Sequence, residues 1–407
     1  VKLFPPELKV IKTLKYRIMK NGQETAAIQK AKQEYPQSII VDNLLHVRDQ
    51  VPFNLGSPLQ RLQRLQELGY TAVNKTKGGN PSVDEEGLLA FLQALQEESE
   101  ACGRKGHIPA IKALAEWMVV SARNKSLAEW LDCVDWKDSC IHGRVFTCGA
   151  NSRRATHNNP NTTTVPSNEA KYGEVCRSLW GARNGRVLVG GDAKSCQARM
   201  FGDYLVKFTS IDNLKVGMEF ATGDPHTRNA EACGIGRRPV KNVFFALIFG
   251  ARDGRLGKTG HGGKGTKAQG EAIRKALYNT TTGLAECIER AGQDFNKNSG
   301  WLECPDGGWV RCPEESAALN YYIQPAEAVL MKLVAIKVYR KIKRLGLDAL
   351  QVQFSHDEIQ YDCVDLLTAA IVGRIFRRSM QQAGKELGFI IPMEGSTSFG
   401  LNWRDTH

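Results

Sequence analysis

Two aspartates stand at the predicted ends of rigid strands, where carboxylates can bind metal ions. Asp192 closes the apolar run at residues 186–191, which is typical of a buried strand. Asp357 lies in the short polar centre of residues 352–361, and the alternating apolar residues on both sides predict a β-hairpin. Carboxylates that converge from different strands can hold two divalent ions roughly 3.5–4 Å apart and support phosphoryl transfer. Each aspartate alone would also suit an ordinary turn.

A second group of residues combines positive charge with aromatic rings at steps of four. Arg237, Lys241, Phe245 and Phe249 would lie along one slowly turning face of a helix. A guanidinium and an ammonium can neutralise phosphate oxygens, and an aromatic ring can stack on a base. The pattern therefore fits a nucleoside triphosphate. Standing alone, it is better explained by an amphipathic helix with a basic first turn and an aromatic core stripe.

Three further polar residues could contact a nucleotide or a nucleic acid. His226 lies in the turn at residues 223–227 and could meet a phosphate. Asn320 and Gln324 would share one helical face, and their amides could read the acceptors of a DNA minor groove. An exposed histidine at a helix start and exposed amides would look the same in the sequence.

The composition points to a polyanionic partner. The chain has 407 residues and a net charge of +12, and its length predicts two or three units with separate cores. A hydrophobic content of 42% suits a globular protein, and no apolar run reaches the roughly 18 residues that a membrane span needs. Ten basic and two acidic residues between positions 237 and 275 supply +8 of the charge. Nucleic acid is the first expected partner, and an anionic membrane surface is the second.

The eleven cysteines are irregularly spaced, odd in number and without a secretory context. This usage predicts reduced, mostly buried thiols in an intracellular protein rather than a disulfide framework.

The elements that would position these residues change along the chain. The first third is predicted to be helical, with an amphipathic helix around residues 59–68, a basic loop at residues 74–81 and helices over residues 84–135. After about residue 140 the pattern admits strands, and residues 213–320 are again predicted as helices interrupted by glycines.

Three motifs, taken together and in order, resemble those of the family A (Pol I-like) DNA polymerases. Residues 192–199 (Asp-Ala-Lys-Ser-Cys-Gln-Ala-Arg) look like motif A, residues 237–250 look like motif B, and residues 354–358 (Phe-Ser-His-Asp-Glu) look like motif C. No single motif is specific, but the ordered triple is. The resemblance covers the chain from about residue 50 to the end.

Supporting matches lie between and around the motifs. Residues 53–58 and 75–86 resemble the thumb, and residues 154–161 resemble the segment that contacts the minor groove of the primer–template. Residues 400–403 (Gly-Leu-Asn-Trp), followed by a terminal His407, are similar to the phage branch of the family.

The resemblance implies an α+β right-hand polymerase fold with an antiparallel-sheet palm, helical fingers and a helical thumb. We expect the N-terminal stretch and thumb at residues 1–126, the palm at residues 127–204 and 320–407, and the fingers at residues 205–319. It also implies a template-directed DNA polymerase of phage replication in the host cytoplasm. Its partners would be primer–template DNA and dNTPs, without a membrane; an accessory processivity or exonuclease partner is unknown.

The resemblance assigns catalytic roles to a few residues. Asp192 and Asp357, with the backbone carbonyl of Ala193, would bind two Mg²⁺ ions, for which Mn²⁺ is the expected substitute. Glu358 would be an auxiliary acid beside them. Lys241 would be the general acid toward pyrophosphate.

The resemblance also assigns residues to the two substrates. The residues that would bind the nucleotide are Arg237, Lys241, Phe245, Phe249, His226, Gln197 and Ala193. The residues that would contact DNA are Arg154, Asn320, Gln324, His356, Lys75 and Lys77.

Two departures from the family pattern matter. Motif A of the DNA enzymes has Glu where this chain has Gln197, and that Glu screens the ribose 2′ position. We therefore expect sugar discrimination to survive in weakened form. The segment before Phe53 carries no Asp-x-Glu motif of a proofreading domain, so no 3′→5′ exonuclease is expected in this chain.

Two other functions stay open at the level of sequence. A single-subunit phage-type RNA polymerase, or a polymerase with relaxed choice between ribose and deoxyribose, would share the two aspartates and the Arg/Lys helix. Gln197 is the one feature that favours this alternative. Glu358, Arg199 and the thumb matches favour DNA. A non-catalytic nucleic-acid-binding protein is disfavoured because both predicted metal carboxylates are present.

Overall fold

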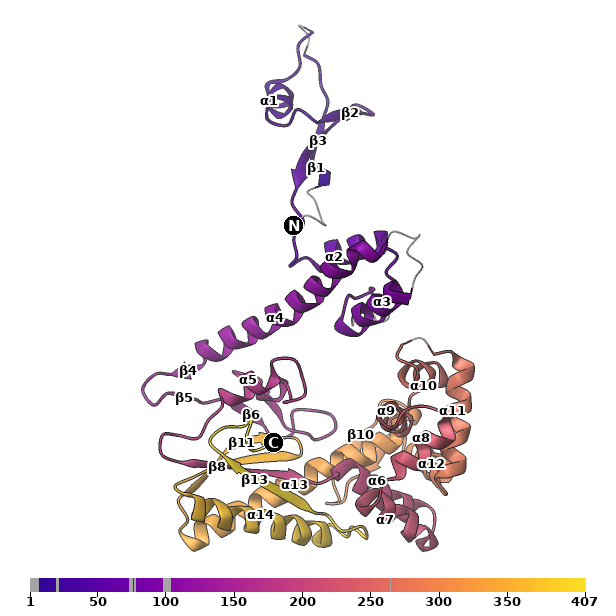
Figure 1. Cartoon of the computed structure of the whole chain (residues 1–407), viewed down its shortest axis with the longest axis vertical. Helices are drawn as coiled ribbons and strands as arrows, with labels where there is room; N and C mark the ends of the chain where they lie inside the picture. Colours follow the sequence, from indigo (N-terminus) through magenta and orange to yellow (C-terminus); the bar gives the residue numbers. More distant parts are fainter. Residues whose placement is uncertain (1–6, 20–21, 73–75, 77, 98–103, 264) are drawn as a thin grey trace. The chain divides into compact units, whose positions relative to one another are not determined.

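The computed structural model describes residues 7–19, 22–72, 76, 78–97, 104–263 and 265–407. The chain forms two compact units, Val1–Met118 and Val119–His407, which we describe separately (Figure 1). Among the described residues, no helix combines the length and the apolar character needed to cross a bilayer.

The first unit begins with a small antiparallel sheet in the order β1-β3-β2. Its strands are β1 (Glu7–Lys15), β2 (Ile39–Val41) and β3 (Leu44–Val51), and helix α1 (Ala26–Glu34) packs on it through Ile28. The prediction of a wholly helical first third is therefore wrong here. Leu45 and Val47 are buried on either side of His46, and this period of two suits a strand with one buried face.

The rest of the first unit is helical, as predicted. It contains α2 (Pro58–Glu67) and α3 (Glu85–Glu97), then the 3₁₀ turn η2 (Arg104–His107) and the start of α4 (Ile108–Asp132). Ser57 caps α2 by accepting a hydrogen bond from the backbone of Gln60 at 3.4 Å, and Leu65 is fully buried against α3 and α4. The predicted amphipathic helix is thus confirmed.

The second unit is built on a four-stranded antiparallel sheet in the order β11-β12-β8-β13. The strands are β8 (Val187–Ala193), β11 (Ala349–Ser355), β12 (Glu358–Cys363) and β13 (Gly395–Gly400). The long helices α13 (Ala318–Leu345) and α14 (Leu366–Glu386) accompany the sheet (Figure 1). Phe376 of α14 occupies the space that a Cβ at Gly191 would need, with ring atoms 2.7 Å from that position, so the glycine lets helix and strand pack closely.

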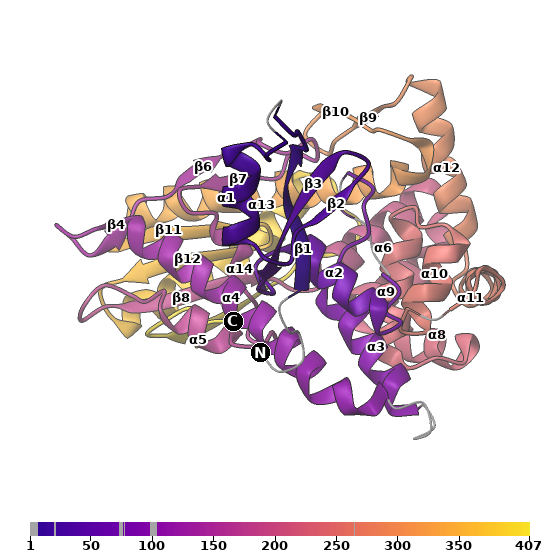
Figure 2. The same ribbon diagram turned by 90° about the horizontal axis from the view of Figure 1, so that it is seen from above.

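A bundle of shorter helices lies to one side of this sheet in the second unit (Figure 2). They are α6 (Cys196–Phe208), α7 (Leu214–Thr222), α8 (Pro225–Cys233), α9 (Arg237–Ile248), α10 (Asp253–Gly260), α11 (Lys267–Thr280) and α12 (Leu284–Lys297), with the 3₁₀ turn η4 (Ile211–Asn213) before α7. The predicted helical region is confirmed, except that the hairpin of β9 (Trp301–Glu303) and β10 (Trp309–Arg311) interrupts it before η5 (Glu315–Ala317).

Short elements connect α4 to the sheet. They are β4 (Val134–Asp135), β5 (Cys140–Ile141), β6 (Arg144–Phe146), β7 (Thr156–Asn158), η3 (Thr162–Thr164) and α5 (Gly173–Ser178). Strands β6 and β7 pair antiparallel, which places residues 153–158 in the same unit as the sheet.

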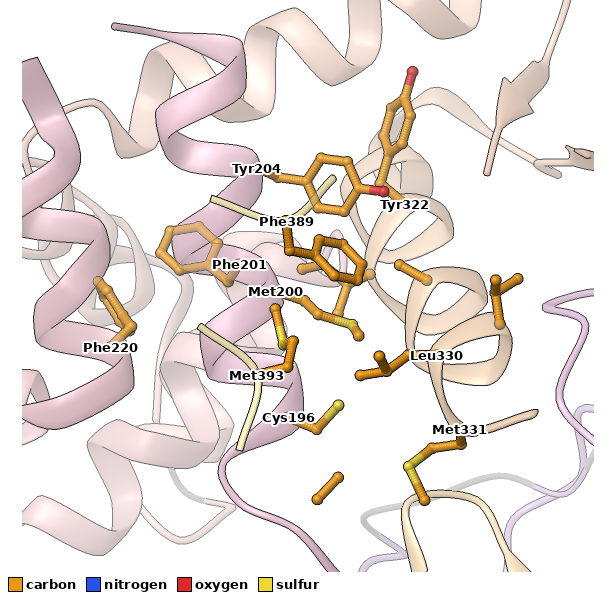
Figure 3. Close-up of a cluster of buried hydrophobic side chains, with 14 of the residues drawn as sticks. Cys196, Met200, Phe201, Tyr204, Phe220, Tyr322, Leu330, Met331, Phe389 and Met393 are labelled. Atoms are coloured by element: carbon orange, nitrogen blue, oxygen red, sulfur yellow. The ribbon is translucent and has the colours of Figure 1, made fainter. Parts of the chain in front are cut away.

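One hydrophobic core joins the sheet to the helical bundle. Side chains from α6 face those of α13 and of residues 389–393 in this core (Figure 3). Phe201 of α6 meets Phe220 of α7 and Phe244 of α9 edge to face, at ring-centroid distances of 4.8 and 5.2 Å. Because the core is continuous, the sheet and α9 are held in one unit.

Candidate active site

The structure brings the two predicted aspartates together at one end of the sheet, where the central strands β8 and β12 pair. Asp192 is the second-last residue of β8 and pairs in register with Glu358, the first residue of β12. Asp357 lies in the two-residue turn between β11 and β12, and its carbonyl accepts a hydrogen bond from the amide of Ala193 at 2.9 Å. The predicted strand end and hairpin turn are therefore confirmed, and they are neighbours.

The electrostatics at this end of the sheet suit a cation. Burial, together with the negative charges of Asp357 and Glu358, raises the pKa of Asp192 to about 6. Two carboxylates and a peptide carbonyl are oxygen donors of the kind that Mg²⁺ prefers. A divalent ion would relieve the repulsion between these buried carboxylates. The set of oxygen donors therefore fits the predicted metal.

Glu358 is held differently from the two aspartates. Its side chain is buried, and Oε1 accepts hydrogen bonds from Trp403 Nε1 at 2.6 Å and Gln360 Nε2 at 2.5 Å. Oε2 lies 3.1 Å from His407 Nδ1. Both oxygens are thus engaged within the protein, although the sequence suggests an auxiliary acid beside the metal ions. Gln360 lies two residues further along β12 on the same face, whereas Trp403 is distant in the sequence and could not be predicted as a partner.

Helix α9 presents the predicted charged and aromatic stripe away from its core face. Arg237 and Lys241 are exposed, and Phe245 and Phe249 are half-buried, with their rings 5.9 Å apart. A different face of the helix is fully buried, through Val240, Val243, Phe244 and Leu247. The stripe is therefore not the core face of an ordinary amphipathic helix. Gly250 follows the stripe at φ +89°, and a Cβ there would lie 2.3 Å from the carbonyl oxygen of Ser316.

Two other predicted residues lie beside the start of α9. Arg237 donates to Asp224 through Nε at 2.9 Å and Nη2 at 3.1 Å. His226 is buried on α8, with its ring 5.8 Å from that of Phe244 and 6.1 Å from that of Phe245. Burial, and then the charges of Lys241 and Arg237, lower the pKa of His226. Its imidazole is therefore the neutral form at pH 7.

A third group gathers around α13. Arg154 forms an ion pair with Glu327, a residue for which the sequence predicts no role. Gln197 Nε2 donates to the other carboxylate oxygen of Glu327 at 3.4 Å. The burial of Glu327 raises its pKa, and the charge of Arg154 opposes this shift. Only the fold could reveal this contact, since its three residues come from three separate segments.

The other residues that were predicted to contact DNA differ in their positions and burial. Asn320 and Gln324 are half-buried on α13, and the Oδ1 atom of Asn320 is buried without a partner among the described residues. His356 precedes Asp357 in the hairpin turn, at φ +54°. Burial, and then the charge of Arg154, lower the pKa of His356. Lys75 and Lys77 lie outside the described residues.

Arg199, the last residue of the motif A segment, has a supporting role. It is 1% exposed, donates to the carbonyls of Lys194, Pro392 and Ala221, and pairs with Glu394 at 2.9 Å. The guanidinium therefore fixes the loop that follows Asp192.

One exposed cluster in the described part of the chain also has metal-ligand geometry. Asp135, Asp138 and His142 bring one donor atom each within 4.8 Å of one another around the β4–β5 turn. His142 Nε2 lies 2.8 Å from Asp138. The cluster is far in sequence from the predicted metal ligands and provides a useful control for metal binding.

Comparisons with known proteins agree with this geometry. The family model "DNA polymerase family A" matches residues 24–405. The DNA-directed DNA polymerases of Enterobacteria phage T3 and Escherichia phage T7 are each 28% identical over 391 residues, covering 88% of this chain and 53% of each relative. DNA polymerase I of Aquifex aeolicus is 23% identical over 356 residues, covering 85% of this chain and 58% of the relative. The chain thus spans about half the length of the phage relatives.

A solved structure gives the fold. The POL domain of Pol1 from M. smegmatis, in complex with DNA primer-template and dNTP, superposes with a TM-score of 0.73 at 20% identity, covering 88% of this chain and 62% of that one. The predicted right-hand polymerase fold is confirmed. The ordered motifs, the aspartates at one end of the sheet and the family match over most of the sequence lead to one conclusion: this chain belongs to DNA polymerase family A, with its similarity to the phage branch confirmed.

Proposed function

We propose that this chain carries a template-directed DNA polymerase activity that extends a primer 3′-hydroxyl with dNTPs and releases pyrophosphate. The observation that carries the proposal is the meeting of Asp192 and Asp357 at one end of the sheet, where β8 and the β11–β12 turn are joined by a backbone hydrogen bond of 2.9 Å. The similarity to the T3 and T7 enzymes favours a role in phage DNA replication.

The proposed parts of the hand follow the elements. The palm is the four-stranded sheet with the segments at residues 127–204 and 320–407, and the fingers are the helices at residues 205–319. The thumb is assigned to the helical part of residues 1–126. The continuous core between sheet and helices supports the placement of palm and fingers in one unit.

The metal site is assigned to Asp192, Asp357 and the carbonyl of Ala193. Two bound Mg²⁺ ions, or Mn²⁺ in their place, would supply Lewis acidity for the attacking 3′-hydroxyl and for the leaving pyrophosphate. The protein's part is to hold both carboxylates on rigid strands. Glu358 stabilises this arrangement from within the sheet, since its two oxygens are bound by side chains.

The residues of α9 and its surroundings are assigned to the triphosphate. Arg237 and Lys241 bind phosphate oxygens, and Lys241 supplies the proton that pyrophosphate takes as the bond between the α- and β-phosphates breaks. Phe245 packs on the sugar and Phe249 lies near the templating base. Neutral His226 donates a hydrogen bond to phosphate from beside them.

The contacts to the primer–template are assigned to half-buried polar residues of the palm. Arg154, Asn320 and Gln324 read minor-groove acceptors, which every correct base pair presents alike. His356 lies beside the primer terminus, next to Asp357 in the turn. Lys75 and Lys77 complete the assignment as phosphate contacts of the thumb.

Primer extension tests the proposal. A 5′-labelled primer annealed to a longer template is incubated with dNTPs and Mg²⁺, with the unaltered chain, Asp357→Ala and the control Asp138→Ala. We expect extension by the unaltered chain and the control, and at least a thousandfold loss in Asp357→Ala, because a metal-binding carboxylate is removed. Extension that persists in Asp357→Ala would reject the metal assignment.

Two outcomes would favour other functions. Extension with rNTPs at rates similar to dNTPs would support the RNA polymerase or relaxed-sugar alternative, which Gln197 keeps open. Binding of primer–template without extension under any divalent ion would support a non-catalytic nucleic-acid-binding protein.

A further inference from the structure

A buried carboxylate lies at the junction of the proposed nucleotide and primer sites. Glu327 belongs to α13, three residues after Gln324, and is 1% exposed. Its two oxygens contact different partners: one pairs with Arg154, from the segment before β7, and the other accepts from Gln197 of α6. One anion thus holds a proposed minor-groove residue and a proposed nucleotide residue at once.

The cost of burial makes this contact specific. An ionised carboxylate inside a protein is destabilising unless a positive charge and hydrogen bonds compensate it. Arg154 provides the positive charge, and it is itself only 19% exposed. Because removal of either member leaves the other charge buried, Arg154 and Glu327 are fixed relative to each other.

The same carboxylate orients the amide of Gln197. An ionised carboxylate can only accept hydrogen bonds, so the Nε2 side of the amide must face Glu327, at 3.4 Å. The amide oxygen then points elsewhere, and it makes no hydrogen bond to any residue that the structure describes. It remains available as an acceptor in the first turn of α6, directly after the loop that follows Asp192.

We propose that Glu327 is a positioning residue that fixes Gln197 and Arg154 as one unit, and that it thereby sets how the sugar of the incoming nucleotide is accepted. The carboxylate at position 327 and the amide at position 197 form a matched pair. Two carboxylates at these positions would repel at short range, and two amides would leave Arg154 without a counter-charge. The proposal deepens the proposed polymerase function and rests on it.

A charge exchange between the two positions tests the pair. The variants are Glu327→Gln, Gln197→Glu and the double variant, and the measurement is the ratio of kcat/KM for dNTP to that for rNTP on the same primer–template. We expect each single variant to lower the ratio at least fivefold. Gln197→Glu restores the residue of the family pattern, but in this chain it places a second carboxylate against the buried Glu327. In the double variant, the ratio should return to within about threefold of that of the unaltered chain, because one carboxylate and one amide are again present.

Thermal melting of the same four proteins gives a readout that does not need activity. Gln197→Glu should melt lowest, and the double variant should melt higher than the sum of the single effects predicts. If Glu327→Gln melts below the assay temperature, the proposal is tested by comparing the sugar ratios of Gln197→Glu and the double variant. Glu386→Gln is the matched control, since Glu386 pairs with Lys337 at the surface and its loss should change neither quantity.

The outcomes separate this proposal from the proposed function. Suppose that the unaltered chain extends primers, and that Glu327→Gln discriminates between the sugars equally well or the two substitutions act additively. Then the proposed role of Glu327 is rejected, and the polymerase function is not. If the unaltered chain fails to extend any primer, the polymerase function is overturned first. A drop in melting temperature with an unchanged sugar ratio would leave Glu327 as a stabilising residue and also reject the proposal.

Discussion

Arg237 donates two hydrogen bonds, of 2.9 and 3.1 Å, to the carboxylate of Asp224. Because of these bonds, the pKa of Asp224 falls to about 2, and the pair is ionised at neutral pH. The side chains are 59% and 45% exposed, so water screens their attraction and the pair contributes little to stability. Asp224 therefore holds the guanidinium at the start of α9 in a contact that a phosphate can replace.

Replacement of Arg237 should chiefly weaken nucleotide binding. A hydrogen bond to a charged group is worth roughly 1.5–3 kcal/mol, and about 1.4 kcal/mol is a tenfold change in affinity. We expect Arg237→Ala to raise the KM for dNTP at least tenfold, with a smaller change in kcat. Steady-state primer extension at varied dNTP concentration measures both.

The neighbouring Arg238 provides the matched control. Its side chain is 86% exposed and lies 3.5 Å from Glu169, so it shares the charge and helix of Arg237 without the contact to Asp224. Arg238→Ala should change the KM less than threefold. Equal effects of both substitutions would mean that only the overall charge of this helix matters.

The local parts of the site could be predicted from the sequence. The apolar run before Asp192, the alternation around Asp357 and the four-residue spacing from Arg237 are short-range patterns, and each gave the element that the structure contains. Their meeting could be expected only from the resemblance to a family. Hydrophobic periodicity says which face is buried, but it does not say which other element buries it.

The contacts of Glu327 and Glu358 could not be predicted. Glu327 appears in the sequence as one acid within a helix, and its partners Arg154 and Gln197 lie far away along the chain. Glu358 follows Asp357 directly and so resembles an auxiliary acid beside the metal ions, whereas in the structure it is the first residue of β12 and binds the buried Trp403. The prediction missed strands β1 and β3, although Leu45 and Val47 alternate with His46 in the period of two that is typical of a strand.

Divalent ions should stabilise the protein through Asp192 and Asp357. The Asp192 carboxylate is ionised at pH 7.5, since this pH lies above even its raised pKa of about 6. An ion that binds only the folded form raises the melting temperature by mass action. We expect 10 mM MgCl₂, roughly 100 times a typical Kd in the 0.1 mM range, to raise the melting temperature of the unaltered chain by several degrees.

The same titration on variants locates the bound ion. Asp192→Asn and Asp357→Asn should lose the shift, and without Mg²⁺ Asp192→Asn should melt no lower than the unaltered chain, because a repelled buried charge is gone. Asp138→Ala alters the exposed cluster with Asp135 and His142 and should keep the shift. A shift that disappears only in Asp138→Ala would place the ion at the exposed cluster.

His226 should make the protein less stable in mild acid. Burial lowers its pKa in the folded protein, so the unfolded chain binds a proton first as the pH falls below about 6.5, the usual value for histidine. The free energy of unfolding therefore falls as the pH drops through this window. His226→Gln lacks this group and should lose less stability between pH 7.5 and pH 5.5 in urea titrations.

The quantity to compare is the difference in the free energy of unfolding between the unaltered chain and His226→Gln at each pH. This difference is needed because His157 and His356 are also buried and have lowered pKa values. Their contributions cancel between the unaltered chain and His226→Gln. A stability gap between His226→Gln and the unaltered chain that stays constant with pH would show that His226 does not titrate in this range.

Trp403 should stabilise the sheet through Glu358. The indole is 3% exposed, and its Nε1 donates to Glu358 Oε1 at 2.6 Å, while its ring lies 4.6 Å from the guanidinium of Arg177. Trp403→Phe keeps an aromatic ring but removes the donor to a buried carboxylate, which costs about 1–3 kcal/mol. Urea denaturation should show this loss, and Trp309→Phe, at a tryptophan that is 50% exposed, should not.

The activity of Trp403→Phe then decides what Glu358 does. If Glu358 stabilises the sheet, the variant loses stability but extends primers at nearly the normal rate below its melting temperature. If Glu358 is the auxiliary acid that the sequence suggests, a freed carboxylate opposite Asp192 changes metal binding, and extension falls at temperatures where the variant is fully folded. The bonds from Trp403 and Gln360 and the contact with His407 favour the first outcome, because they leave neither oxygen of Glu358 unengaged.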